Sequence, residues 1–179
     1  MGLRTQKRRR RENRTDYKAR RLMLTSGLPR IVVRKTNKHF ILQAVESHEA
    51  QDKVLATVTS KDLLKNGWDK KKAGSLKGIS AGYLTGILMA KKLATRNSVP
   101  SKKGTSEKVP SSSGKGKYIV DLGMARTLKG GRVFAVVAGL VEGGLDINAD
   151  KKVFPSEDRL MGEHCELKDM VAKVKGGLA

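Results

Sequence analysis

The sequence contains a single cysteine, Cys165, among its 179 residues. One cysteine cannot form an internal disulfide and cannot supply a cysteine-rich zinc site. The longest mostly apolar stretch, residues 79–90, is followed by two lysines and falls short of the roughly 20 residues that a membrane-spanning helix needs. No apolar segment of signal-peptide length follows the basic N-terminus. These absences predict a cytoplasmic protein with no membrane partner and no disulfide framework.

Acidic residues are scarce: 17 Asp and Glu stand against 38 Lys and Arg, which gives a formal net charge of +21. Solubility alone needs a net charge of only about 2–8 in a small domain. Lys and Arg that neutralise phosphates release condensed counterions, so this excess predicts a polyanionic partner. The charge is also uneven, with a net +23 on residues 1–141 and a net −2 on residues 142–179. Different partners are therefore expected for the two regions.

Ten of the first 21 residues are Lys or Arg, including the block Lys7–Arg11. So polar a segment cannot bury enough apolar surface to fold alone, and we expect it to stay disordered until phosphates neutralise it. A helix is expected over residues 12–24, docked through Leu22. Arginine clusters near Tyr17 can grip phosphates and stack on unpaired bases. A polybasic block is also typical of a nuclear-localisation signal, but that address would not need the basic residues that continue into the domain, such as Lys70–Lys72.

Strand signals begin after Pro29. Runs at 30–34 and 39–45 flank a turn, and a third run at 54–59 completes an antiparallel meander. The period then becomes helical over residues 79–95, where Gly82 and Gly86 would allow a close approach to the sheet. A short buried strand is expected at 118–122, with helices at 132–142 and after Ser156. The order β-β-β-α-β-α predicts an α/β domain, a mixed β-sheet with packed helices.

The composition divides the chain into three parts. Residues 1–29 are expected to form a basic RNA-binding arm with a short helix, and residues 30–150 are expected to form the α/β core domain. A Ser/Gly/Lys-rich stretch within the core, residues 97–117, is expected to be a flexible loop. Residues 151–179 are expected to form a C-terminal helical tail.

Groups able to do catalysis are few. A metal-dependent nuclease with this strand order needs carboxylates on adjacent strands to hold two metal ions roughly 4 Å apart, and residues 30–45 contain no acid. Asp121 and Glu142 remain as isolated carboxylates. His164 and Cys165 are neighbours in sequence with no oxyanion element beside them. We therefore expect no enzyme, no metal and no cofactor.

The segment Lys129–Arg132 places two glycines between two cations, before a helix. It lacks the spacing of a nucleotide-binding loop. Its backbone N–H groups could face an RNA phosphate, or the glycines could simply form a tight turn, and the residues leave both interpretations open.

A series of motifs occurs in one order over about nine-tenths of the chain: Arg8–Glu12, Arg14–Tyr17, Gly27–Arg30, Arg34–His39, Asp62–Leu63, Gly67–Trp68, Tyr83–Gly86, Asp121–Gly123, Arg132–Ala135, Gly144–Ile147, Arg159 and Gly162–His164. This series resembles the archaeal and eukaryotic branch of the large-subunit ribosomal protein L-eighteen family. The loop at 97–117 is longer than usual for that family. The short tail after His164 favours the archaeal type.

The resemblance implies a structural ribosomal protein with a ribonuclease-H-like core that lacks catalytic acids. It implies binding to 5S ribosomal RNA, which the protein would anchor in the central protuberance of the large subunit. The large-subunit ribosomal RNA and neighbouring large-subunit proteins are the other implied partners. The residues that it places against RNA are Arg8, Arg9, Arg10, Arg11, Arg14, Tyr17, Arg20, Arg30, Arg34, Lys35, Asn37, Lys38, His39 and Trp68. For Trp68, packing against the sheet is an equally good interpretation.

Two other classes of function stay open on the residues alone. One is a nucleic-acid-processing enzyme, and the other is a basic regulatory or chaperone protein that acts off the ribosome. Stoichiometric presence in large ribosomal subunits is the observation that separates both from a ribosomal protein.

Overall fold

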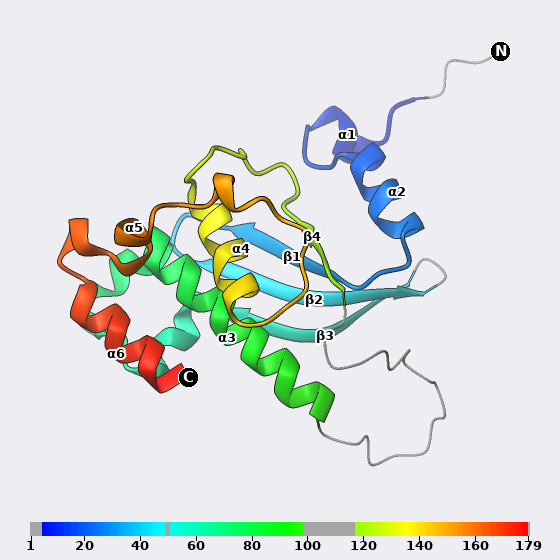
Figure 1. Ribbon diagram of the computed structural model, residues 1–179. Coiled ribbons are helices and arrows are strands. Elements are labelled where there is room, and N and C mark those ends of the chain that lie inside the picture. Colours follow the sequence, from blue (N-terminus) through cyan, green and yellow to red (C-terminus); the bar gives the residue numbers. More distant parts are fainter. Residues whose placement is uncertain (1–4, 49–50, 99–116, 179) are drawn as a thin grey trace.

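The computed structural model describes residues 5–48, 51–98 and 117–178. Its helices are α1 (Arg8–Arg11), α2 (Tyr17–Thr25), α3 (Ile79–Ser98), α4 (Arg132–Glu142), α5 (Glu157–Met161) and α6 (Lys168–Leu178), and its strands are β1 (Arg30–Lys35), β2 (Phe40–His48), β3 (Gln51–Thr59) and β4 (Ile119–Asp121). Short 3-10 helices occupy Ser60–Asn66 (η1), Lys70–Lys77 (η2), Lys151–Val153 (η3) and Glu163–Cys165 (η4). Figure 1 shows the helices α3 and α4 lying across the sheet.

The four strands form a mixed sheet in the order β3-β2-β1-β4. β1 pairs with β2, and β2 with β3, in antiparallel fashion, whereas β4 runs parallel to β1. An isolated parallel bridge from Lys117 to Asp146 extends the sheet beyond β4. The expected α/β class with a mixed sheet and packed helices is confirmed.

One face of the sheet carries the core because apolar residues alternate along each strand. Ile31, Val33, Phe40 and Leu42 are at most 1% exposed and point toward α3 and α4. The helix α4 begins and ends at the expected residues, and α3 begins where expected but ends three residues later. β4 is shorter than the expected strand at 118–122, and its side chains are half-buried rather than buried.

The glycines of α3 allow close packing against the helix α4 as well as against the sheet. A Cβ on Gly86 would collide with the backbone of α4 at Val136, and a Cβ on Gly139 would collide with the backbone of α3 at Tyr83. Only Gly82 also meets the sheet, where an added Cβ would lie 3.3 Å from the Phe40 ring. Close packing of α3 at its glycines is therefore found as expected, but Gly86 allows α3 to approach α4, and only Gly82 allows it to approach the sheet.

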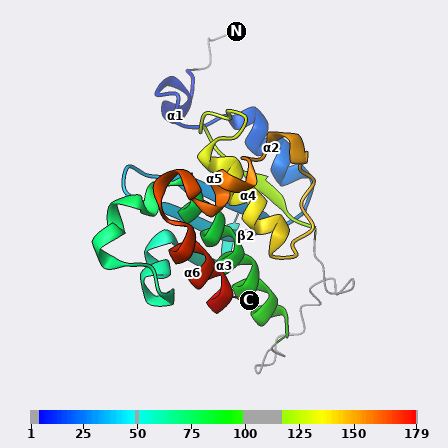
Figure 2. The ribbon, with the colours of Figure 1, turned by 60° about the vertical axis from the view of Figure 1, so that its left-hand side comes forward.

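A second apolar cluster lies beside the first and joins the C-terminal helix to the core. Val171, Val174 and Leu178 of α6 are buried in the same cluster as Leu63 and Trp68. Residues 168–178 thus pack on the body rather than projecting from it. Figures 1 and 2 place α1 and α6 at opposite ends of the molecule.

The N-terminal arm differs from its expected form in two respects. Instead of one helix over residues 12–24, the chain forms α1, a turn and then α2, which begins at Tyr17 because the Asp16 carboxylate accepts hydrogen bonds from the N–H groups of Lys18 and Ala19. Leu22 does not dock this helix, since it is 65% exposed and α2 buries no residue.

Most of the loop expected at 97–117 lies outside the described residues. No helix in the described part of the chain has the length and apolarity needed to cross a membrane.

Candidate nucleic-acid interface

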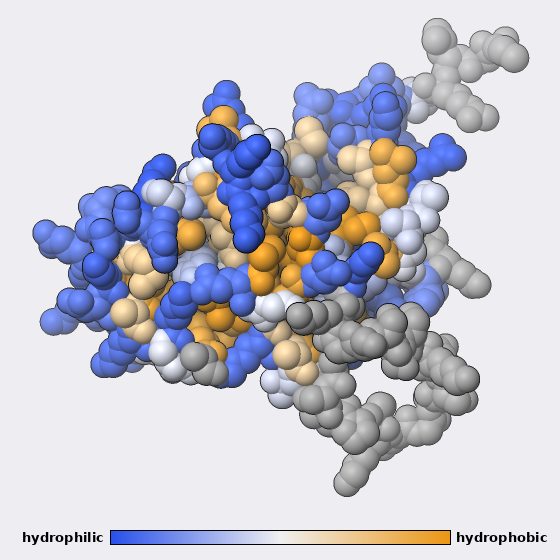
Figure 3. Space-filling view, in the orientation of Figure 1, coloured by the Kyte–Doolittle hydropathy of each residue, from blue (hydrophilic) through white to orange (hydrophobic). Residues whose placement is uncertain are grey.

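The arm concentrates exposed arginines on α1. Among the described residues α1 has one ion pair, from Arg8 to Glu12 at 3.7 Å, and Glu12 also lies 3.3 Å from Arg14. Arg9 donates a hydrogen bond to the Thr15 hydroxyl at 2.8 Å, which ties α1 to the turn before α2. Neither Arg10 nor Arg11 forms an ion pair within the described ranges. One carboxylate therefore faces a group of guanidinium ions, and the surface over α1 is hydrophilic (Figure 3).

Two further expected residues lie on α2. The Lys7 ammonium sits 4.7 Å from the centre of the Tyr17 ring, a cation–π contact. Arg20 reaches across to the β2–β3 hairpin, where its guanidinium lies 3.4 Å from the Asp52 carboxylate. Both side chains of this pair keep considerable exposure, so Arg20 can exchange its partner for a phosphate.

Arg30, by contrast, is held inside the protein. Its side chain is 7% exposed, and its guanidinium lies 2.6 Å from Asp52 and 2.7 Å from the Ser47 hydroxyl. The hydrogen bond from Ser47 lowers the pKa of Asp52 most strongly, burial opposes it, and the hydrogen bond and charge of Arg30 lower it further. Arg30 therefore links β1 to the end of the β2–β3 hairpin, and its guanidinium is not available to RNA in this arrangement. The patterns in the sequence did not single out Asp52, although the hairpin register places it opposite Ser47.

Arg34 is also paired, although its side chain is 45% exposed. Its guanidinium lies 3.1 Å from both carboxylate oxygens of Asp121 and donates to the Asp121 carbonyl at 2.8 Å. Gly123 has a positive φ of 59°, and a Cβ there would lie 2.9 Å from the guanidinium carbon. Asp121 is thus the partner of an arginine and not a free metal ligand. No cluster of three or more metal-ligating side chains exists among the described residues.

The turn between β1 and β2 presents its side chains outward. The Thr36 hydroxyl accepts from the His39 N–H at 3.0 Å and donates to the His39 carbonyl at 2.7 Å, which fixes the turn from within. Lys35, Asn37 and Lys38 are left exposed. His39 is half-buried, and its Nδ1 is buried without a hydrogen-bond partner in the described structure.

Trp68 lies in the second apolar cluster. It is 2% exposed, and its indole N–H donates to the Lys72 carbonyl at 3.3 Å. A ring packed on both faces cannot stack on a base, so the geometry favours packing over RNA contact. The sequence could not decide between the two because a tryptophan after a glycine occurs in either setting.

The glycine-rich segment before α4 forms a turn. Gly131 donates its N–H to the Leu128 carbonyl at 2.9 Å, and Gly130, with a φ of 68°, donates to the Val153 carbonyl at 3.0 Å. Both glycine N–H groups are used inside the protein. The tight-turn interpretation is therefore the better one.

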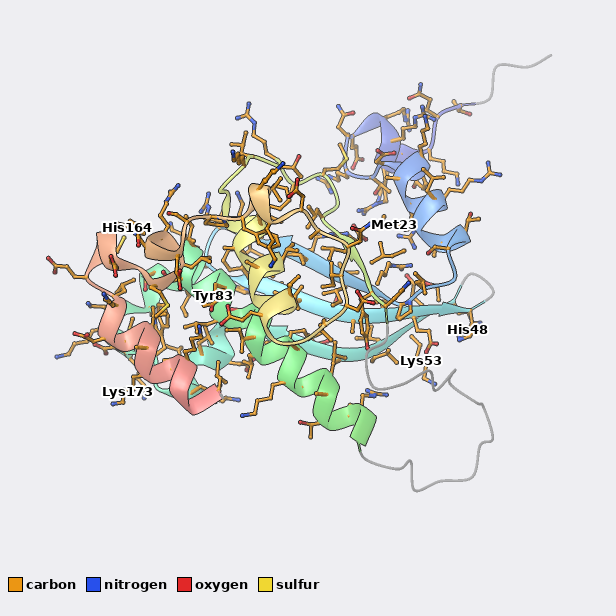
Figure 4. All side chains as sticks on the ribbon, in the orientation of Figure 1. Met23, His48, Lys53, Tyr83, His164 and Lys173 are labelled. Atoms are coloured by element: carbon orange, nitrogen blue, oxygen red, sulfur yellow. The ribbon has the colours of Figure 1, made fainter. Side chains whose placement is uncertain are left out.

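The strongest perturbation of ionisable groups lies far from the arm, around Tyr83 (Figure 4). There Tyr83, Glu142 and Lys175 join α3, α4 and α6. The Tyr83 hydroxyl donates to Glu142 and accepts from Lys175 at 2.8 Å, and Lys175 also lies 2.6 Å from Glu142. Burial, helped by the bond to Glu142, raises the pKa of Tyr83 to about 12. Burial would also raise the pKa of Glu142, but the hydrogen bonds from Lys175 and Tyr83 hold it below its ordinary value. The Lys175 ammonium is paired with the Glu142 carboxylate, and the Tyr83 hydroxyl bonds to both, so the three side chains link the helices α3, α4 and α6.

Comparison with known proteins gives a consistent result. Residues 2–150 match the model of a family described as ribosomal large subunit proteins 60S L5 and 50S L18. The chain is 41% identical over 157 residues to the large ribosomal subunit protein uL18 of Methanoregula boonei, covering 88% of this chain and 78% of that protein. The proteins of the same name from Caldivirga maquilingensis and Methanospirillum hungatei are 39% and 37% identical, each over 88% of this chain and over 66% and 78% of their own length. These are ribosomal proteins, not enzymes.

Proposed function

We propose that this chain, which belongs to the family of ribosomal large-subunit proteins 60S L5 and 50S L18, binds 5S ribosomal RNA and anchors it in the central protuberance of the large subunit. Family membership makes it a structural ribosomal protein of the translation machinery. The particular RNA, the place within the subunit and the cytoplasmic location of the ribosome are parts of the proposal.

The observation that carries the proposal is the excess of unpaired guanidinium on the arm. Arginine binds phosphate with two parallel hydrogen bonds when no internal acid competes. The arm carries the four arginines of α1 and one adjacent carboxylate, Glu12. The turn at Lys35–Lys38 adds further exposed cations at the end of β1. The arm at residues 1–29 would thus grip the RNA, while the core at 30–150 and the helices at 151–179 would hold it in place.

The expected contact residues divide into two groups on these grounds. Those that stay available to RNA are Arg8, Arg9, Arg10, Arg11, Arg14, Tyr17, Arg20, Lys35, Asn37, Lys38 and His39. Arg30, Arg34 and Trp68 instead use their polar groups or their ring within the protein. Both 5S and large-subunit RNA are offered as partners of the first group.

A salt titration tests the phosphate contacts. If at least six phosphates are neutralised, log affinity for 5S ribosomal RNA should fall against log salt with a slope of about −4 or steeper. The Arg11→Gln variant should reduce the size of this slope by about 0.7–0.9. The matched control is Lys173→Gln, since Lys173 is exposed on α6 at the other end of the molecule. A nearly flat titration of the parent protein would count against the proposal.

Two further experiments address the other classes of function. Sedimentation of host-cell lysate should find the chain in large subunits in stoichiometric amount, and absence there would favour a regulator acting off the ribosome. Incubation with 5S RNA or an RNA–DNA hybrid and magnesium or manganese should leave the nucleic acid intact. Cleavage that the Asp121→Asn change removes would instead establish an enzyme.

A further inference from the structure

A small pocket lies where the arm meets the loop that follows β4. Its volume is about 220 Å³, and six arm residues between Arg10 and Lys18 line it together with Met124 from the loop. The two segments that build it are more than a hundred residues apart in the sequence. The residues that the sequence predicted to contact RNA did not include Asn13, Asp16 or Met124, and only the folded chain brings the loop of Met124 to the arm.

The size and lining of this arm pocket restrict what it can hold. Pockets for drug-sized ligands measure about 300–1,000 Å³, so this one has room for a single ring system. Tyr17 offers an aromatic face, and Met124 offers a polarisable thioether on a side chain that is 56% exposed. Thioether sulfur makes favourable contacts with aromatic rings. A flat aromatic ligand fits these two walls.

The polar groups of the pocket suit the edge of such a ring. One carboxylate oxygen of Asp16 accepts from the N–H groups of Lys18 at 2.9 Å and Ala19 at 3.1 Å. Among the described residues its other oxygen has no hydrogen-bond partner, and neither does the Asn13 amide. Asn13 adopts a φ of 50°, a left-handed conformation that asparagine tolerates better than most residues. The pocket thus offers acceptors and one amide donor side by side.

The surroundings of the pocket are cationic. Arg10 and Lys18 are on its lining, and Lys7 lies over the Tyr17 ring. Cations around a stacking site suit a ligand whose ring is attached to phosphates, as in single-stranded nucleic acid.

We infer that the arm pocket receives one unpaired nucleobase of the bound RNA, held between Tyr17 and Met124 and read along its edge by Asn13 and Asp16. This inference rests on the proposed RNA binding and adds base recognition to it. The free carboxylate oxygen of Asp16 accepts hydrogen bonds, as from the exocyclic amino group of adenine, cytosine or guanine.

The test compares two alanine variants in the full-length protein. Met124→Ala removes a wall of the pocket, while Leu128→Ala removes an equally exposed side chain, at 58%, from the same loop but outside the pocket. Loss of base stacking should weaken binding to 5S ribosomal RNA by about 5- to 100-fold in Tyr17→Leu. Loss of the thioether contact should weaken it by about 2- to 10-fold in Met124→Ala. Leu128→Ala should bind as the parent does. No charge is removed in any of them, so the salt slope should not change.

Chemical modification of the RNA bases supplies the second readout. One unpaired base should be protected along its Watson–Crick edge by the parent and by Leu128→Ala, and should react again in the Met124→Ala complex. Equal affinities of the two alanine variants, or no protection that depends on Met124, would overturn the inference while leaving salt-dependent binding intact. Failure of the parent to show that salt dependence would instead contradict the proposed function. Because Met124 is mostly exposed, its loss should not unfold the protein, and circular dichroism checks this.

Discussion

The arginines of the arm and those of β1 are the same residue type in opposite situations. The arginines of α1 share one neighbouring acid, Glu12. On β1, Arg30 pairs with Asp52, which Arg20 also contacts, and Arg34 pairs with Asp121. The difference lies in which acids the fold brings near, Asp52 from the hairpin and Asp121 from β4. Under the proposed function, a basic residue without an acidic partner is available to RNA, and one that is held by an acid inside the protein supports the fold.

Aromatic residues follow the same division. Tyr17 of the arm is half-buried and lines an open pocket, while Trp68 is enclosed among Leu63, Leu76 and the residues of α6. Under the proposed function, the arm carries groups that meet a ligand, and the body uses chemically similar groups for its own stability.

Deleting residues 1–21 should produce the largest effect. Affinity for 5S ribosomal RNA should fall by about a thousandfold or more, because the phosphate contacts of the arm are lost together. The core should stay folded, since α1 and α2 bury no residue. RNA binding and thermal unfolding of the same preparation measure the two outcomes. A variant that unfolds, or that binds RNA undiminished, would erase the distinction between arm and body.

Trp68→Ala should destabilise the body by about 3–5 kcal/mol, the usual cost of emptying a large aromatic site in a core. Urea unfolding measures this loss. In the parent protein, Trp68 is the only tryptophan of the chain, so its fluorescence reports on this one site. Its emission in the parent should stay the same when RNA binds, because the indole is enclosed. Strong quenching by RNA would show that the ring faces the nucleic acid after all.

Exchanging single arginines sharpens the comparison. Arg30→Met should lower the free energy of unfolding by about 2 kcal/mol, less than for a fully buried pair because Asp52 is 38% exposed. The folded variant should bind RNA as the parent does. Arg10→Met should show the reverse pattern, with unchanged stability and weaker RNA binding. Identical behaviour of the two variants would mean that burial does not decide the role of an arginine here.

A smaller effect concerns acid stability. The folded protein holds the pKa of Asp52 below its ordinary value of 3.8, so its contribution to stability is fully present above that pH and is lost as the pH falls through the lower, folded-state pKa. Asp52→Asn should therefore cost less than about 1 kcal/mol near neutrality. It should also flatten the loss of stability below about pH 4. Urea unfolding of both proteins from pH 6 to pH 2.5 measures this, and parallel curves would contradict the account.

Much of the architecture follows from local patterns. The strands around the Lys35–His39 turn and the helix α4 were expected within a few residues, because β-branched alternation and helical period are properties of neighbouring residues. The helix expected at 12–24 was wrong at its start, where the capping carboxylate of Asp16 outweighed the helical character of the residues before it. The docking role of Leu22 was wrong because its apolarity says nothing about whether a partner surface is present.

The sequence by itself determined the polyanionic character of the partner, the place of the arginine arm and the lack of acids on the first two strands. Each of these is a matter of composition along the chain, which folding does not change. Only the tertiary structure decided that Arg34 meets Asp121, 87 positions away, that Trp68 is enclosed by α6, and that Met124 comes to the arm. Side chains so distant in sequence meet only when the strands pair and the helices pack, and the free energy of that packing is set by the whole core rather than by either residue.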